Sequence, residues 1–197
     1  GIWRSDGTKD GTFILQSFEQ VGANLDNIGT EKLLVTVSDG TRGAEPAIYD
    51  INTQSWTFLA DINTADPATD FLTGGSWAGY QANLGEKILF TARSSDKYNN
   101  SQLWVTDGTP QGTILVADPD PLENTIEFNS EFIVINGVAY FYVDSSSPEK
   151  KGIWRSDGTK DGTFILQSFE QVGANLDNIG TEKLLVTVSD GTRGAEP

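Results

Sequence analysis

The sequence predicts an all-β fold, a β-propeller built from four-stranded antiparallel blades, on three observations. Short apolar segments that alternate with turn residues recur along the chain, and no stretch keeps the 3.6-residue apolar period of a helix. The same strand pattern returns every 46 to 55 residues around an aromatic residue. Four-stranded units of about this length are typical of propeller blades. The aromatic positions are Trp3, Tyr49, Trp104 and Trp154.

An apolar strand opened by a turn precedes each aromatic position after the first. These strands begin after turns at Gly29, Gly85 and Asn136, and again after Gly180. Asn136-Gly137 is the strongest hairpin signal, because both residues accept the positive φ of a two-residue turn. In the third unit the four strands are expected at 131–135, 138–144, 152–156 and 163–169.

A longer repeat is superimposed on this period. Residues 1–46 recur without a change as residues 152–197. The chain is therefore expected to start with a half-blade and to end with the complementary half-blade, as a processed product or a segment of something longer. The expected division is a half-blade at 1–18, blades at 19–62, 63–118 and 119–169, and a half-blade at 170–197.

Two of the three distinct units carry a recognisable motif. LWVTDGTPQGTILVAD, from Leu103, and IWRSDGTKDGTFILQSF, from Ile2, resemble the ELWxTDGTxxGTxLVxD tandem repeat of large secreted or surface-attached bacterial proteins. The resemblance implies a β-propeller and an extracellular or cell-surface location. AIYDINTQSWTFLADI, from Ala47, lacks the DGTxxGT core and looks more like a generic kelch-type blade.

Composition excludes several functional classes. The chain has no His, no Cys and no Met, which removes Ser-His-Asp and Cys-His catalysis, ordinary zinc sites and disulfides. A formal charge of -15 makes nucleic acid a poor partner. No apolar run approaches the ~20 residues of a membrane-spanning helix, so no membrane insertion is expected.

The DGT loops raise the question of a metal. The sequence from Asp6 to Gly11, repeated from Asp157 to Gly162, fits the first half of an EF-hand-like calcium loop, but Ser17 replaces the acid expected at the twelfth position. The favoured interpretation is a tight turn capped by the first aspartate. Calcium is the alternative, and no other cofactor is expected. Its candidate ligands are Asp6, Thr8, Asp10, Asp157, Thr159 and Asp161.

Aromatic residues suggest a second kind of site. Trp3, Trp104 and Trp154 occupy equivalent strand positions and are expected to be packing anchors. A ligand-contacting patch, with a glycan as its partner, is instead expected at Trp77, Tyr80 and Tyr98, near a Gly-rich segment. The acidic loops at 61–70 and 118–123 are expected to be solvated surface rather than a glycosidase site, so no enzyme activity is expected.

The function predicted from these features is a non-enzymatic structural or adhesive module of a secreted or cell-surface bacterial protein. Unpaired half-blades expose strand edges that recruit other strands, either within the chain or between copies as a ring or filament. The partner expected is therefore the protein itself. A carbohydrate-binding propeller, with or without calcium, and an engineered propeller fragment are the alternatives.

Overall fold

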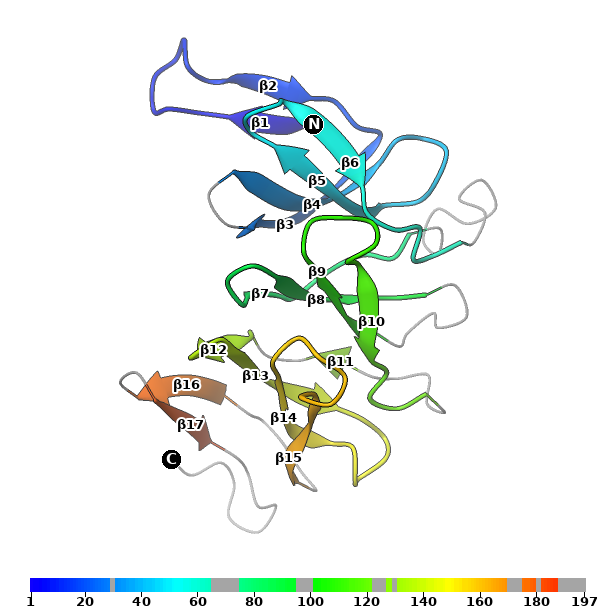
Figure 1. Cartoon of the computed structure of the whole chain (residues 1–197), viewed down its shortest axis with the longest axis vertical. Helices are drawn as coiled ribbons and strands as arrows, with labels where there is room; N and C mark the ends of the chain where they lie inside the picture. The colour runs from blue at the N-terminus through cyan, green and yellow to red at the C-terminus, as the bar shows by residue number, and fades with distance from the viewer. Residues whose placement is uncertain are drawn as a thin grey trace.

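A computed structural model describes residues 1–28, 31–64, 75–94, 101–121, 127–128, 131–169, 175–179 and 182–187. All regular elements in these ranges are β-strands, which form five antiparallel sheets. The all-β prediction is confirmed. The first four sheets follow one another along the long axis of the molecule in chain order, and the last lies beside the fourth (Figure 1).

Each sheet is made from consecutive segments of the chain. The N-sheet contains β1 (Ile2–Arg4) and β2 (Phe13–Gln16). Sheet 1 contains β3 (Gln20–Ile28), β4 (Lys32–Ser38), β5 (Glu45–Asp50) and β6 (Ser55–Phe58). Sheet 2 contains β7 (Gln81–Asn83), β8 (Ile88–Ala92), β9 (Gln102–Thr106) and β10 (Ile114–Ala117). Sheet 3 contains β11 (Glu127–Phe128), β12 (Ile133–Ile135), β13 (Val138–Asp144), β14 (Gly152–Ser156) and β15 (Phe164–Ser168). The C-sheet contains β16 (Asn175–Ile179) and β17 (Lys183–Thr187).

In sheet 3 the turn residues determine where two of the strands end and begin. Asn136 and Gly137 have φ values of 52° and 76°, so the hairpin between β12 and β13 forms at the expected dipeptide. The sequence did not indicate β11, which pairs with the far end of β13 through Glu127 and Asp144.

The hydrophobic cores lie between neighbouring sheets, because each sheet has one apolar face toward the preceding sheet and one toward the next. Ile2 packs with Val35 and Val37 between the N-sheet and sheet 1. Leu34 packs with Phe90 between sheets 1 and 2. The largest core lies between sheets 2 and 3 and contains Leu89, Leu103, Val105, Phe141, Val143 and Trp154.

The first strands of successive sheets are also neighbours in space. β3 contacts β7, β7 contacts β12, and β12 contacts β16. The described sheets form an open succession and close no ring, and the N-sheet and the C-sheet are well separated from each other (Figure 1). None of the described residues forms a helix of the length and hydropathy that crossing a membrane requires.

Candidate functional site

The DGT turns are built by one aspartate and one threonine. In the turn between β9 and β10, Asp107 Oδ1 accepts hydrogen bonds from the backbone N of Thr109 at 2.9 Å and from its Oγ1 at 2.6 Å. Gly112 N donates to Thr109 Oγ1 at 3.0 Å. The same bonds form at the two copies of the other motif, around Asp6 and Asp157. The motif therefore satisfies its backbone donors within the loop.

Glycine is required inside these turns for a steric reason. A Cβ on Gly112 would overlap the carboxylate of Asp107, and Gly11 and Gly162 face Asp6 and Asp157 in the same way. The capping aspartate approaches the backbone so closely that only glycine fits at the second glycine position of the motif.

The candidate calcium ligands serve the turn. Hydrogen bonds from Thr8 lower the pKa of Asp6, and those from Thr159 lower the pKa of Asp157. Asp10 and Asp161 are exposed beside them. In the part of the chain that the structure describes, no three carboxylates are grouped so that they could hold a metal ion.

The predicted ligand patch is only partly described. Trp77 is half-buried with a φ of 47°, and its indole Nε1 is buried with no hydrogen-bond partner among the described residues. Tyr80 is 44% exposed and stacks on Phe132, with ring centroids 6.2 Å apart. Tyr98 lies outside the described residues. A patch formed by all three residues therefore stays a prediction.

The equivalent tryptophans reveal what distinguishes the ends of the molecule. Trp104 packs into the core between sheets 1 and 2, and Trp154 packs between sheets 2 and 3. Each tryptophan faces the preceding sheet. Trp154 is 7% exposed and its Nε1 donates to the Lys150 carbonyl at 2.9 Å. Trp3, in an identical local sequence, is 64% exposed. The expectation of a packing anchor is therefore wrong for Trp3, because no described sheet precedes the N-sheet.

The turn residues show the same difference. A Cβ on Gly158 would meet Leu84 and Val105 of sheet 2, and one on Gly108 would meet Ile28 and Lys32 of sheet 1. At Gly7 no described atom lies within 4 Å of this position. The face that the N-sheet directs away from sheet 1 is therefore uncovered along the turn as well as at Trp3.

The C-sheet has the complementary uncovered face. Ile28 and Leu34 in sheet 1 are 7% and 0% exposed, because they pack against sheet 2. Their copies, Ile179 and Leu185, are 54% and 46% exposed. Both are in the C-sheet, which lies beside sheet 3 and has no described sheet on its other side.

Each terminal sheet also has an open strand edge. In sheet 3, β14 pairs with β13 on one side and β15 on the other, whereas β1 pairs with β2 alone among the described residues. β4 likewise pairs with β3 and β5, whereas β17 pairs with β16 alone in the described part. Open edges carry unpaired backbone donors and acceptors and are sites of strand addition.

A cavity of about 660 Å³ lies between the N-sheet and sheet 1 and reaches the open edge of β1. Ile2, Trp3 and Arg4 line it from the edge strand, and Leu33 and Tyr49 line it from sheet 1. The equivalent space between sheets 2 and 3 is filled by core residues such as Leu89 and Phe141. Phe13, Ile14, Leu15 and Gln16 of β2 also line the cavity, so it extends under both strands of the N-sheet.

A buried carboxylate that no sequence pattern predicted holds the connection between β6 and β7 against sheet 1. Glu45 is fully buried and accepts hydrogen bonds from the backbone N atoms of Ile62 (3.0 Å), Asn63 (3.2 Å) and Ser76 (2.9 Å). Desolvation raises its pKa to about 7. Its donors come from segments 17 to 31 residues away, so no local pattern identifies this role.

No protein-family model matches this chain, and a comparison with curated proteins gives no match.

Proposed function

We propose that this chain is a non-enzymatic structural or adhesive repeat module that self-associates through its two terminal sheets. The supporting observation is the contrast within the repeated segment: Trp154 is 7% exposed and Trp3 64%, while Leu34 is 0% exposed and Leu185 46%. The same side chains are core in one copy and surface in the other. Exposed apolar surface of this kind marks an association site.

The two surfaces are complementary in kind. Trp3 belongs to the face that packs on a preceding sheet, and Leu185 belongs to the face that packs on a following sheet. A contact between two different patches is heterologous, so it generates rings when the rotation closes and filaments when it does not.

We further propose that sheets 1, 2 and 3 are blades of a β-propeller and that the terminal sheets are half-blades. This proposal is supported by the four-stranded meanders of sheets 1 and 2, by the antiparallel pairing of β12 to β15 in sheet 3, by the cores between successive sheets and by the contacts among β3, β7, β12 and β16. Under this proposal, joining an N-sheet to a C-sheet completes one more blade.

The proposed setting is the outside of a bacterial cell. The chain has no cysteine, carries a net charge of -15 and closes its DGT turns by their own side-chain hydrogen bonds. These features suit a durable extracellular module that needs no redox chemistry.

Light scattering on the purified chain across a dilution series tests the self-association. We expect the mass to rise from 21.3 kDa toward multiples of this value with concentration. Trp3→Ala should lower the apparent association constant, whereas Tyr80→Ala, at an exposed aromatic residue away from both ends, should leave it unchanged. A mass of 21.3 kDa at every concentration up to the millimolar range would refute the proposal.

A further inference from the structure

We infer that β16-β17 of one copy and β1-β2 of a second copy form one continuous four-stranded sheet, in which β17 pairs antiparallel with β1 and Leu184 lies opposite Trp3. This inference rests on the proposed self-association and specifies its partner, strand order and register. The complete sheets of the same chain show what each terminal strand pairs with.

The register follows from a pairing that all three complete sheets share. The aromatic residue of the third strand lies opposite a fixed position of the preceding strand: Leu33 opposite Tyr49, Phe90 opposite Trp104 and Phe141 opposite Trp154. Leu184 is the sequence copy of Leu33, and Trp3 is the copy of Trp154. Joining the two strands in the common register sets Leu184 opposite Trp3.

The faces of the two strands agree in this register. Leu185 falls opposite Ile2, and Ile2 already packs toward sheet 1, so Leu185 is directed into the gap where the cavity lies. Leu184 and Trp3 are directed to the other face, toward sheet 3 of the first copy. A slip by one residue would reverse every side chain of β17, which makes this register specific.

The hydrogen-bond phase of the new pair can also be read from sheet 1. The backbone N of Ile51 donates to the Glu31 carbonyl at 2.7 Å, one step beyond the Lys32 and Asp50 pair. Antiparallel pairs alternate, so Lys32 and Asp50 are a non-hydrogen-bonded pair. Lys183 and Arg4, which take the corresponding places, therefore have Cα atoms about 4.5 Å apart in the joined sheet.

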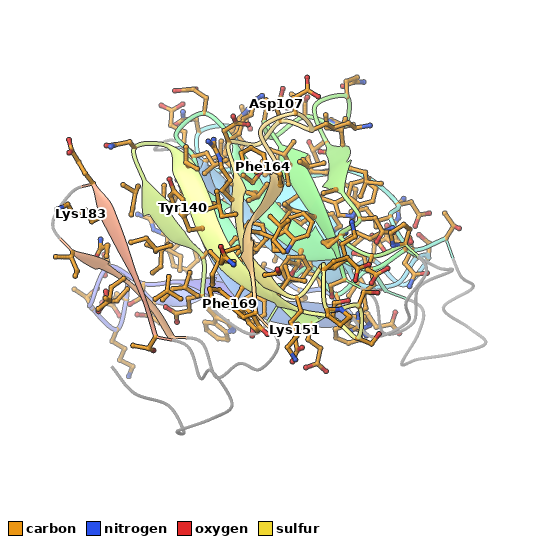
Figure 2. The ribbon with its side chains drawn as sticks, turned by 90° about the horizontal axis from the view of Figure 1, so that it is seen from below. Asp107, Tyr140, Lys151, Phe164, Phe169 and Lys183 are labelled. Carbon is orange, nitrogen blue, oxygen red and sulfur yellow. The ribbon has the colours of Figure 1, made fainter. Side chains whose placement is uncertain are left out.

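A second copy, rather than the other end of the same chain, is the proposed partner because of the arrangement of the sheets. The N-sheet lies at one end of the long axis, whereas the C-sheet lies beside sheet 3 in the other half of the molecule, so the two terminal sheets are well separated (Figure 1). Figure 2 shows Lys183 on the outer margin of the molecule, on the side of the C-sheet away from Tyr140 of sheet 3. No other strand among the described residues covers either edge.

One feature of the joined strands makes the register directly testable. Lys183 lies opposite Arg4, a like-charge pair, whereas the corresponding pair in sheet 1 is Lys32 and Asp50. Like charges directly opposite each other weaken a strand pair, and opposite charges strengthen it. Both side chains are exposed, so their substitution leaves the fold intact.

The first test is a charge-reversal cycle measured by sedimentation equilibrium. Lys183→Glu and Arg4→Glu should each tighten self-association by about two- to tenfold, and the double variant should return to the wild-type value. Lys87→Glu, an exposed lysine on the turn between β7 and β8, is the control for the change in net charge and should weaken association slightly. Self-association that does not respond to either reversal would overturn the register while leaving the proposed function standing.

The second test is disulfide trapping, which is clean because the chain has no cysteine. Arg4→Cys and Lys183→Cys chains, purified separately and mixed under mild oxidation, should give a crosslinked dimer of twice 21.3 kDa as the main new product. Mixing Arg4→Cys with Leu185→Cys, two residues out of register, should give at least tenfold less. A crosslink that forms only inside one chain carrying both Arg4→Cys and Lys183→Cys would overturn the second-copy partner, and equal crosslinking of both mixtures would overturn the register.

Discussion

Replacing Trp154 and Trp3 separately by alanine compares the same residue in the same local sequence with and without a neighbouring sheet. Trp154 is 7% exposed and Trp3 is 64% exposed. A tryptophan side chain offers about 250 Å² of surface, so Trp154 buries roughly 140 Å² more than Trp3. At ~25 cal/mol per Å² this is about 3.5 kcal/mol, and losing the Trp154 Nε1 hydrogen bond to Lys150 adds about 1 kcal/mol.

We therefore expect Trp154→Ala to lower the free energy of unfolding by about 4.5 kcal/mol more than Trp3→Ala does. The assay is urea unfolding followed by tryptophan fluorescence and circular dichroism, at a concentration where light scattering gives a monomer. Similar losses in the two variants would refute the assignment of Trp3 to an uncovered face. At concentrations where the chain associates, the cost of Trp3→Ala should grow, because the second copy then covers this side chain.

Three further predictions concern the turns, the buried carboxylate and salt. Gly112→Ala should destabilise the fold by about 1 to 3 kcal/mol, because its Cβ overlaps Asp107. Adding Asp107→Ala should remove much of that loss, which urea midpoints measure. Equal losses with and without Asp107→Ala would contradict the contact between Gly112 and Asp107. Glu45 has a folded-state pKa of about 7 against 4.5 in the unfolded chain, so the folded state binds the extra proton and stability should fall by about 2 to 3 kcal/mol as pH rises from 4.5 to 7. Glu45→Gln should flatten this slope, and an unchanged slope would exclude Glu45 as its source. Raising NaCl from 0.05 to 0.5 M should strengthen self-association, because it screens the charge of -15 and the Lys183 and Arg4 pair; weakening would exclude charge repulsion as the limiting term.

The fold class could be predicted because the signals for it are local. Asn136-Gly137 forms its hairpin, and the predicted strands at 138–144 and 152–156 are β13 and β14 with the same bounds. Turn residues and alternation act within a few positions, so a single sequence is enough to reveal them.

The exposed faces could be predicted only in part. The repeat phase indicated that half-units occupy both ends, but Trp3 and Trp154 share the sequence that begins at Gly1 and Gly152 and differ in their surroundings. Trp154 has sheet 2 before it, β13 beside it and the Lys150 carbonyl as an acceptor, and Trp3 has no described counterpart of these. The burial of these tryptophans depends on the packing of one sheet on the next and cannot be predicted from a local pattern. Glu45 was missed for the same reason, since Ile62 and Ser76 reach it from distant segments.

The construction of each sheet from one continuous stretch of chain has a consequence for how the protein folds. Strands that pair are close in sequence throughout, from β3 and β4 to β16 and β17, so each sheet closes only short loops as it forms. Chains with mostly local pairings fold fast for their size, and in stacked repeats structure nucleates in one unit and spreads to its neighbours. Sheet 2, which has a complete neighbour on both sides, is then the unit whose amides should exchange most slowly with solvent, with protection declining toward both terminal sheets.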